Sequence, residues 1–485
     1  MPRIHRLCLL GSTFVLLAFG GSACAAGSVR YLSPGGSDQS GDGSRARPWK
    51  TIRHATDRVS DDGATVILLA GLYSGTQSVG RHFEKACTVR AERPYAARLR
   101  SPATGTRALS CYDCSNVTFQ GLELFGSGSA KGEYVVHVGS ARAHHILFED
   151  CIIHDSFQND LVKVNDFTHH VTFRGCLFFN PNDHGGDEHL DINTCTDIAV
   201  EDSILLNDYA GSGRRGANQS HSFIVIKNSG STPNVTQRIA LRRNIFLSWQ
   251  GRTDQAYVLL GEDGKPFDEA RQVTIENNLF IHDSPVRCWG TLLFKGGLRD
   301  VTFRANTVVG HPAMSQYSGA FAVMCLRIEK NPPMGDMLFA NNIWCDPTGQ
   351  MPRFSRGEAK LFEPGSKPLI RNNLYWNGGK EIPSEEKDVF SPARDPKPVL
   401  ADPRLGSLAQ RPTLPRFDPA KGQFLSGQKT IRGEFERLVA QYGAIAADSP
   451  AVHAADPSTM PADDILGRPR GSAPAIGCFE AATTR

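Results

Sequence analysis

Short segments in which apolar and polar residues alternate recur along most of the chain. One copy, residues 171–178, reads Val-Thr-Phe-Arg-Gly-Cys-Leu-Phe, and a later copy, residues 273–280, reads Val-Thr-Ile-Glu-Asn-Asn-Leu-Phe. Further copies follow at intervals of about 25 to 40 residues. Alternation with a period of two predicts β-strands, and a turn at the same place in every copy predicts the stacked coils of a β-solenoid.

Consecutive copies carry an asparagine at the same turn position. These residues are Asn244, Asn278, Asn306, Asn342 and Asn373. Stacked side-chain amides can bond to one another and to the turn backbone, so we expect a single ladder. Earlier copies have Cys151 and Cys176 at this position. Because neighbouring coils lie roughly 4.8 Å apart, we expect these two cysteines to be stacked or disulfide-bonded. A propeller or a two-sheet sandwich would not keep this turn position.

Both ends of the chain resemble the pectate-lyase-like β-helix superfamily. Residues 31–38 read Tyr-Leu-Ser-Pro-Gly-Gly-Ser-Asp and residues 48–55 read Pro-Trp-Lys-Thr-Ile-Arg-His-Ala, which is similar to the N-terminal cap of these proteins. Residues 449–453, 464–468 and 476–480 resemble their terminal segment. The resemblance implies an all-β fold, a right-handed parallel β-helix with an N-terminal cap and a C-terminal covering segment. It also implies an exported protein that acts on a polysaccharide.

The N-terminus has the layout of a cleaved secretory signal. Arg3 and Arg6 precede an apolar run, residues 7–19, and small residues follow up to Ala23-Cys24-Ala25. This predicts a secreted or periplasmic protein, with lipid attachment at Cys24 as the less favoured alternative. We expect four parts: a signal peptide (1–25), a cap with the first coils (26–110), the β-helix repeats (111–376) and a wrapping and capping segment (377–485).

Charge and apolar content exclude some partners. The formal net charge of +3 is too small to indicate nucleic-acid binding. No segment after the signal approaches the roughly 20 apolar residues of a transmembrane helix. We also expect a monomer. Residues 433–443 have the apolar spacing of a short helix, which we expect to cover the last coil.

The cysteines indicate structural roles. Of the 12 cysteines, Cys8 and Cys24 lie in the signal, and the even number that remains predicts some disulfide pairing outside the cytoplasm. Cys111-Tyr-Asp-Cys114 has the spacing of a redox motif, but no helix follows it. We therefore expect a structural disulfide or buried thiols there.

In the resembling superfamily the substrate groove follows the first sheet of the helix. Transferred to this chain, its strands are residues 161–165, 189–193, 223–227, 257–261, 291–295 and 323–327. Leu190 and Ile192 should point into the core, so their neighbours should point outward. The polar or aromatic residues that we expect to face the groove are Lys163, Asn165, Asp187, His189, Asp191, Asn193, His221, Lys227, Tyr257, Lys295 and Arg327.

Our first functional hypothesis is a calcium-assisted lyase that cleaves an acidic, uronate-containing polysaccharide by β-elimination. The oxygen ligands of Ca²⁺ would come from Asp160, Asp187, Glu188 and Asp191. The base would be Lys227 or Lys163, helped by His189 or His221. The substrate would be bound by Lys295, Arg327, Asn165, Asn193 and Tyr257.

Other functions fit the same residues. Residues 186–192, Gly-Asp-Glu-His-Leu-Asp-Ile, resemble the Gly-Asp-Asp motif of polygalacturonase-like hydrolases, and His221 stands where their Gly-His-Gly motif does. Asp160, Asp187 and Glu188 would then act as the acid and base of an inverting hydrolase. A glutamate in place of an aspartate and the missing glycines depart from that pattern. A C5-epimerase, a non-catalytic carbohydrate-binding surface protein and a merely solvated charged face are the remaining alternatives.

Overall fold

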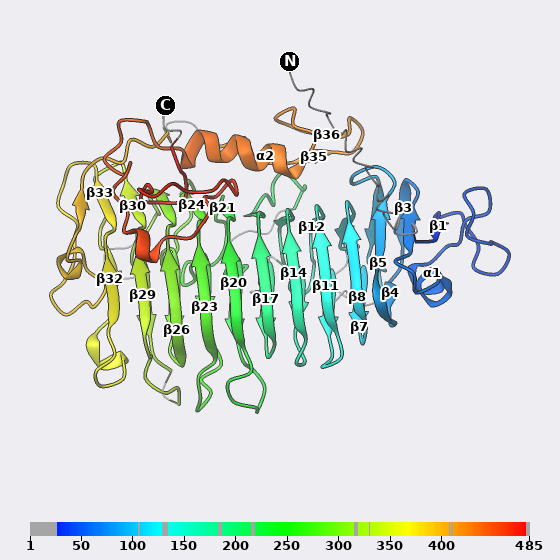
Figure 1. Cartoon of the computed structure of the whole chain (residues 1–485), viewed down its shortest axis with the longest axis horizontal. Coiled ribbons are helices and arrows are strands. Elements are labelled where there is room, and N and C mark those ends of the chain that lie inside the picture. Colours follow the sequence, from blue (N-terminus) through cyan, green and yellow to red (C-terminus); the bar gives the residue numbers. More distant parts are fainter. Residues whose placement is uncertain are drawn as a thin grey trace, which may run out of the picture.

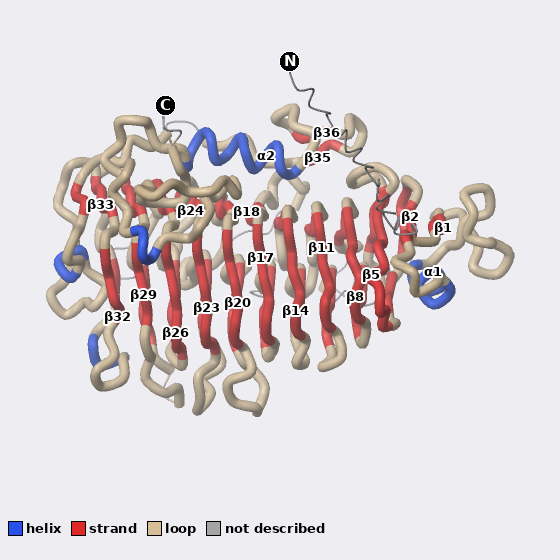
Figure 2. The backbone as a smooth tube through the Cα atoms, viewed as in Figure 1, coloured by secondary structure: helices blue, strands red, loops and turns tan. Residues whose placement is uncertain are grey.

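The computed structural model describes residues 27–104, 107–128, 134–182, 187–214, 219–314, 319–328, 330–406, 408 and 411–481. Over these residues the chain winds into stacked coils, each of which adds one strand to three long parallel sheets (Figures 1 and 2). Each full coil runs through sheet C, then sheet A, then sheet B. The predicted right-handed parallel β-helix is confirmed.

Sheet A has 12 strands. They are β1 (Val29–Leu32), β2 (Thr65–Leu68), β5 (His82–Ala91), β8 (Ser115–Gln120), β11 (His144–Glu149), β14 (His169–Arg174), β17 (Thr196–Glu201), β20 (Gln237–Arg242), β23 (Ala270–Glu276), β26 (Leu298–Arg304), β29 (Met337–Ala340) and β32 (Pro368–Arg371).

Sheet B also has 12 strands. They are β3 (Gly71–Ser74), β6 (Ala97–Arg100), β9 (Glu123–Phe125), β12 (Ile152–His154), β15 (Leu177–Phe179), β18 (Ile204–Leu206), β21 (Ile245–Leu247), β24 (Leu279–His282), β27 (Thr307–Gly310), β30 (Ile343–Asp346), β33 (Leu374–Asn377) and β34 (Val399–Leu400).

Sheet C has 10 strands. They are β4 (Gln77–Val79), β7 (Leu109–Tyr112), β10 (Val136–Gly139), β13 (Val162–Val164), β16 (Leu190–Asn193), β19 (Ile224–Lys227), β22 (Val258–Leu260), β25 (Leu292–Lys295), β28 (Val323–Leu326) and β31 (Ser355–Arg356). A short hairpin pairs β35 (Phe417–Asp418) with β36 (Gln423–Phe424). The helical segments are α1 (Ile52–Arg58), α2 (Ile431–Leu438), a π-helical continuation (Val439–Gly443) and short 3₁₀ turns (Ala359–Leu361, Pro392–Arg394 and Pro457–Thr459).

The repeat keeps its register from coil to coil, so equivalent side chains stack in columns. Phe148 lies between Phe119 and Phe173 in the core, with ring centroids 5.0 and 4.9 Å apart. The asparagine ladder is confirmed: the backbone N–H of Asn278 donates to Asn306 Oδ1 at 2.9 Å, and each neighbouring pair of the ladder repeats this bond. At the end of the ladder, the backbone N–H of Asn373 donates to Asp395 Oδ2 at 2.9 Å. The buried polar groups of these turns therefore have hydrogen-bond partners within the protein.

The cysteines differ from expectation. Cys151 and Cys176 are buried and stacked, and the thiol of Cys176 donates to the backbone carbonyl of Phe148. They are not bonded, and every cysteine of the described chain is a free, buried thiol. The predicted disulfide pairing is therefore contradicted, whereas the buried thiols expected at Cys111 and Cys114 are present. Close-packed columns place these sulfurs in the apolar core, where they act as small hydrophobic side chains.

The C-terminal segment covers the outer face of sheet B. Figure 1 shows α2 lying beside β21 and β24. Phe435 and Leu438 are fully buried in a second apolar core that also contains outward-facing residues of sheet B, among them Ile245 and Leu279. A helix was expected here, but its predicted place over the last coil is wrong. Among the described residues no helix is long and apolar enough to cross a membrane.

Candidate active site

Charged side chains gather on the outer face of sheet C, over β13, β16 and β19. Lys163 pairs in register with Asp191, which pairs with Val225 of the next coil. Leu190 and Ile192, on either side of Asp191, are fully buried in the core. The alternation predicted for this strand is therefore confirmed, and it turns Lys163 and Asp191 toward the outer side of sheet C.

Three carboxylates meet at the start of β16. Oxygen atoms of Asp160, Glu188 and Asp191 all lie within 4.8 Å of one another. Their exposed fractions are only 2, 4 and 3%. Burial, together with the charge of Asp191, raises the pKa of Asp160 to about 7. Burial and the charge of Asp160 likewise raise the pKa of Glu188. Three acids held this close out of water repel one another, and a bound proton or a neighbouring cation relieves that repulsion.

Two lysines border the acidic cluster. The ammonium of Lys163 forms an ion pair with Asp191 and lies 3.9 Å from Asp160 Oδ2. Lys227 Nζ lies 3.8 Å from Asp191 Oδ2 and 2.6 Å from Glu262 Oε2. Burial lowers the pKa of both lysines, but the neighbouring carboxylates outweigh it and raise each pKa above its usual value. Both lysines are therefore charged in this arrangement.

A second group shares Glu188 with the first. His221 Nδ1 lies 3.1 Å from Glu188 Oε1 and 3.9 Å from Glu262 Oε1. Lys295 Nζ lies 3.7 Å from Glu262 Oε1, so Glu262 connects both Lys227 and Lys295 to the cluster. Sequence reasoning missed Glu262. The sequence did carry a signal for Glu262, because this residue stands two positions after the end of β22, one coil after Lys227 and one coil before Lys295.

Asp187 and the two asparagines have local partners. A carboxylate oxygen of Asp187 accepts a hydrogen bond from Asn182 Nδ2 at 2.7 Å, and Asp187 does not join the three clustered acids. Asn193 Nδ2 donates to Ser229 Oγ at 2.8 Å, which ties the turn after β16 to the next coil. Asn165 Oδ1 lies 2.8 Å from His137 Nε2.

Arg327 lies beyond the cluster. It is exposed at the end of β28, and its Nε donates to the backbone carbonyl of Asn331 at 3.1 Å. The charged groups that actually meet are thus those of coils β13 to β25.

The predicted outward orientation of His189 and Tyr257 is wrong. His189 is fully buried, and its Nε2 donates to the backbone carbonyl of Leu206 at 2.7 Å. Burial lowers the His189 pKa to about 3, so the ring is neutral. Tyr257 is 1% exposed and its hydroxyl donates to the carbonyl of Ile281. Each precedes a strand of sheet C by one residue, where the corner of the coil sends two successive side chains inward, as at Phe223.

Comparison with known proteins bears on the fold. No family model and no curated protein matches this sequence. Among solved structures, pectate lyase Pel9A aligns with a TM-score of 0.51 over 95% of this chain and 98% of its own, at 12% sequence identity. The chain has the pectate-lyase-like fold. A rhamnogalacturonan lyase is also similar, with a TM-score of 0.49 and 13% sequence identity over 75% of this chain and 91% of its own. XylC in complex with xylose has a TM-score of 0.49 and 9% sequence identity over 94% of this chain and 98% of its own.

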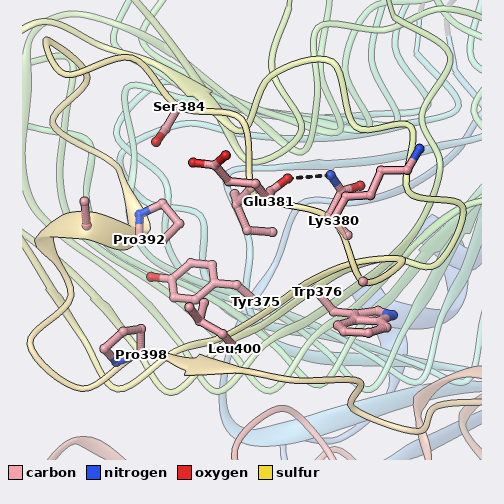
Figure 3. A pocket seen from close by; sticks show the side chains of 12 residues that line it. Tyr375, Trp376, Lys380, Glu381, Ser384, Pro392, Pro398 and Leu400 are labelled. Atoms are coloured by element: carbon pink, nitrogen blue, oxygen red, sulfur yellow. Dashed lines mark hydrogen bonds between the residues drawn. The ribbon is translucent and has the colours of Figure 1, made fainter.

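A cavity at the far end of this pectate-lyase-like helix is separate from the charged groups. Its volume is about 500 Å³, and it is lined by β33, β34 and the segment between them. Figure 3 shows Tyr375, Trp376 and Leu400 on its walls. Within the segment that lines it, Asn377 Nδ2 donates a hydrogen bond to the backbone carbonyl of Glu381 at 2.8 Å. It contains none of the acids of the cluster, and its walls belong to the packing that closes the last coil.

Proposed function

We propose that this protein is a polysaccharide lyase that cleaves an acidic, uronate-containing polysaccharide by β-elimination. Asp160, Glu188 and Asp191 would hold Ca²⁺, and Lys227 would be the base. The observation that carries the proposal is the cluster of three buried carboxylates on the outer side of sheet C, with Lys227 3.8 Å from one of them. We also propose that residues 1–25, which lie outside the described part, direct export.

The residues present fit a calcium ion. Asp191 Oδ1 is buried and has no hydrogen-bond partner, although its side chain lies in a cluster of acids. An orphaned buried carboxylate oxygen is costly, and a cation would satisfy it. All three groups offer the oxygen ligands that Ca²⁺ prefers, whereas imidazole or thiolate would indicate a transition metal. When bound, Ca²⁺ would neutralise a uronate carboxylate and so acidify the adjacent C5 proton.

In this proposal Lys227 takes that proton. In the elimination the C5–H pair of electrons would form the C4=C5 double bond, the C4–O bond would break, and the leaving oxygen would gain a proton from water. A lysine must be neutral to act as a base, and the carboxylates now keep Lys227 charged. A divalent cation on these acids would cancel much of that effect and lower the Lys227 pKa. Glu262 and His221 would orient Lys227 and Glu188 through their short contacts.

Lys163 is the weaker candidate for the base. It forms an ion pair with Asp191 and also lies near Asp160, so it balances the charge of the acids that would bind the metal. Lys227 has a contact outside the three acids, with Glu262, and lies on the coil that follows them. We therefore assign substrate binding or charge balance to Lys163, and removal of the C5 proton to Lys227.

The test is a screen of purified protein against polygalacturonate, alginate and glycosaminoglycans, with calcium and with chelator. Ultraviolet absorbance of an unsaturated product, lost with chelator, would support the proposal. New reducing ends without unsaturation would support a hydrolase instead, in which Asp160, with its pKa near 7, protonates the leaving oxygen. A change of uronate configuration without cleavage would indicate an epimerase, and no reaction on any glycan would contradict an enzymatic role.

A further inference from the structure

The segment Cys111-Tyr-Asp-Cys114 presents one aromatic ring on the outer side of sheet C. Cys111 and Cys114 are fully buried, and burial raises the pKa of the Cys111 thiol, so the reactive thiolate is disfavoured. Tyr112, between them at the end of β7, is 53% exposed. Within β7 the alternation buries Cys111 and turns Tyr112 outward, and Cys114 is buried just after the strand. The spacing of Cys111 and Cys114 therefore reflects packing of two buried thiols and not redox chemistry.

Tyr112 belongs to the same face as the charged cluster. It pairs in register with Gly139 of β10, which precedes β13 with Lys163. Gly139 has no side chain to cover the tyrosine ring. A Cβ atom at Gly139 would lie only 3.0 Å from His137 Nε2 and 3.1 Å from Asn165 Oδ1, so this position favours glycine. The absence of a side chain at Gly139 therefore leaves room for the contact between His137 and Asn165 next to the Tyr112 ring.

Further aromatic and polar groups join Tyr112 to the cluster. The His137 ring lies 6.3 Å from the ring of Tyr112 and 5.2 Å from that of Tyr134. Lys163 Nζ lies 5.9 Å from the centre of the Tyr134 ring, within the range of a cation–π contact. His137 Nε2 meets Asn165 Oδ1 at 2.8 Å. A chain of contacts thus runs from the exposed Tyr112 through the buried His137 to Tyr134 and to Lys163, which contacts the acids.

We propose that Tyr112 and Tyr134 form a binding subsite for a pyranose ring of the polysaccharide, at the N-terminal end of the groove. This deepens the proposed function and rests on it for the identity of the glycan. An exposed aromatic face offers an apolar platform for the C–H face of a sugar, and its polar neighbours can bond to hydroxyl groups. Tyr112 lies three coils before Asp191, roughly 14 Å along the helix axis, so only an oligosaccharide of several residues spans both.

The experiment compares substitutions in this subsite with a matched aromatic control. The variants are Tyr112→Ala, Tyr112→Phe and Tyr134→Ala, and the control is Tyr31→Ala in β1, on sheet A. On the substrate found in the screen, Tyr112→Ala and Tyr134→Ala should raise KM for the polymer roughly five- to tenfold with kcat nearly unchanged. Their effect should vanish on the shortest oligosaccharides that are cleaved. Tyr112→Phe should keep the wild-type KM, because it keeps the ring.

A second readout needs no catalysis. Lys227→Ala protein should be retarded in native gels containing polygalacturonate or alginate, and adding Tyr112→Ala should remove most of the retardation while adding Tyr31→Ala should not. The subsite is overturned if Tyr112→Ala matches the control in both assays, or if the parent protein is not retarded by any glycan. Retardation that depends on Tyr112 in a protein without cleavage would keep the subsite and refute only the lyase. Circular dichroism would verify that each variant is folded.

Discussion

Lys227 Nζ lies 2.6 Å from Glu262 Oε2 and 3.8 Å from Asp191 Oδ2, so one lysine joins an acid of the coil before its own to an acid of the coil after it. Lys227→Ala should abolish unsaturated product, by a factor of at least roughly 10³ in kcat, if this lysine is the base. The same change in Lys295, which contacts only Glu262 among these acids, should mainly raise KM. Absorbance assays on both variants check this, and equal loss in both would contradict the assignment.

Lys227 is also partly structural. Its side chain is 14% exposed, less than an exposed strand lysine would be, and it balances Asp191 and Glu262. Lys227→Ala should therefore lower the free energy of unfolding by roughly 1–3 kcal/mol. Urea unfolding with and without Lys227 measures this, so that loss of activity can be separated from loss of fold.

Calcium binding can be tested through stability. Ca²⁺ should raise the Tm of the wild-type protein, because a ligand that binds only the folded state stabilises it by about 2.7 kcal/mol at a hundred times its Kd. Asp191→Asn should remove most of this gain, since Asp191 Oδ1 would lose its charge. Asp254→Asn, at an aspartate bound by Arg252, is the matched control and should keep the gain. A calcium-independent Tm in the wild type would contradict the metal site.

A histidine outside the site predicts a pH dependence of stability. Burial lowers the pKa of His154, but its contacts with Asp155 (2.7 Å) and Glu123 (3.1 Å) outweigh burial and raise the pKa to about 9. The folded state therefore binds this proton more tightly than the unfolded chain, whose pKa is about 6.5. The resulting stability, up to about 3 kcal/mol, is complete below pH 6.5 and is lost as the pH rises through 9.

The measurement is the Tm of wild type and His154→Gln between pH 6 and 10. The variant should be less stable near pH 6.5, and the difference should shrink as the pH approaches 10. His453→Gln, at an exposed histidine near the C-terminus, should show no such trend. A constant difference over the whole range would show that His154 acts through packing alone.

The C-terminal helix should contribute strongly to stability. Phe435 is fully buried between α2 and sheet B. Phe435→Ala should lower the free energy of unfolding by about 3–5 kcal/mol, as expected for a large buried aromatic residue. Leu425→Ala, at a residue 54% exposed in the same segment, should change it by less than about 0.5 kcal/mol. Similar effects of both changes in urea unfolding would mean that the segment does not share the core.

The sequence was sufficient to predict those features of the structure that a local rule determines. Alternation with a period of two predicted that Leu190 and Ile192 are buried and that Asp191 faces the other way, and the structure agrees. The repeated asparagine predicted the ladder, because a buried turn amide needs a partner in every coil. Both rules act within one coil or between equivalent positions of adjacent coils, so they can be read along the chain.

Tertiary structure decided the direction of side chains at the bends of the coil and the contacts between residues that are distant in the sequence. His189 and Tyr257 point inward because the chain bends just before each strand of sheet C, and strict alternation does not hold at a bend. Glu262 joins the site only because stacking brings its loop beside Lys227. Helix α2 lies on sheet B because that sheet exposes an apolar outer face which must be buried, a demand set by all coils together. Sequence alone thus determined the β-helix and the position of the acids, while three-dimensional packing determined which of their neighbours meet them.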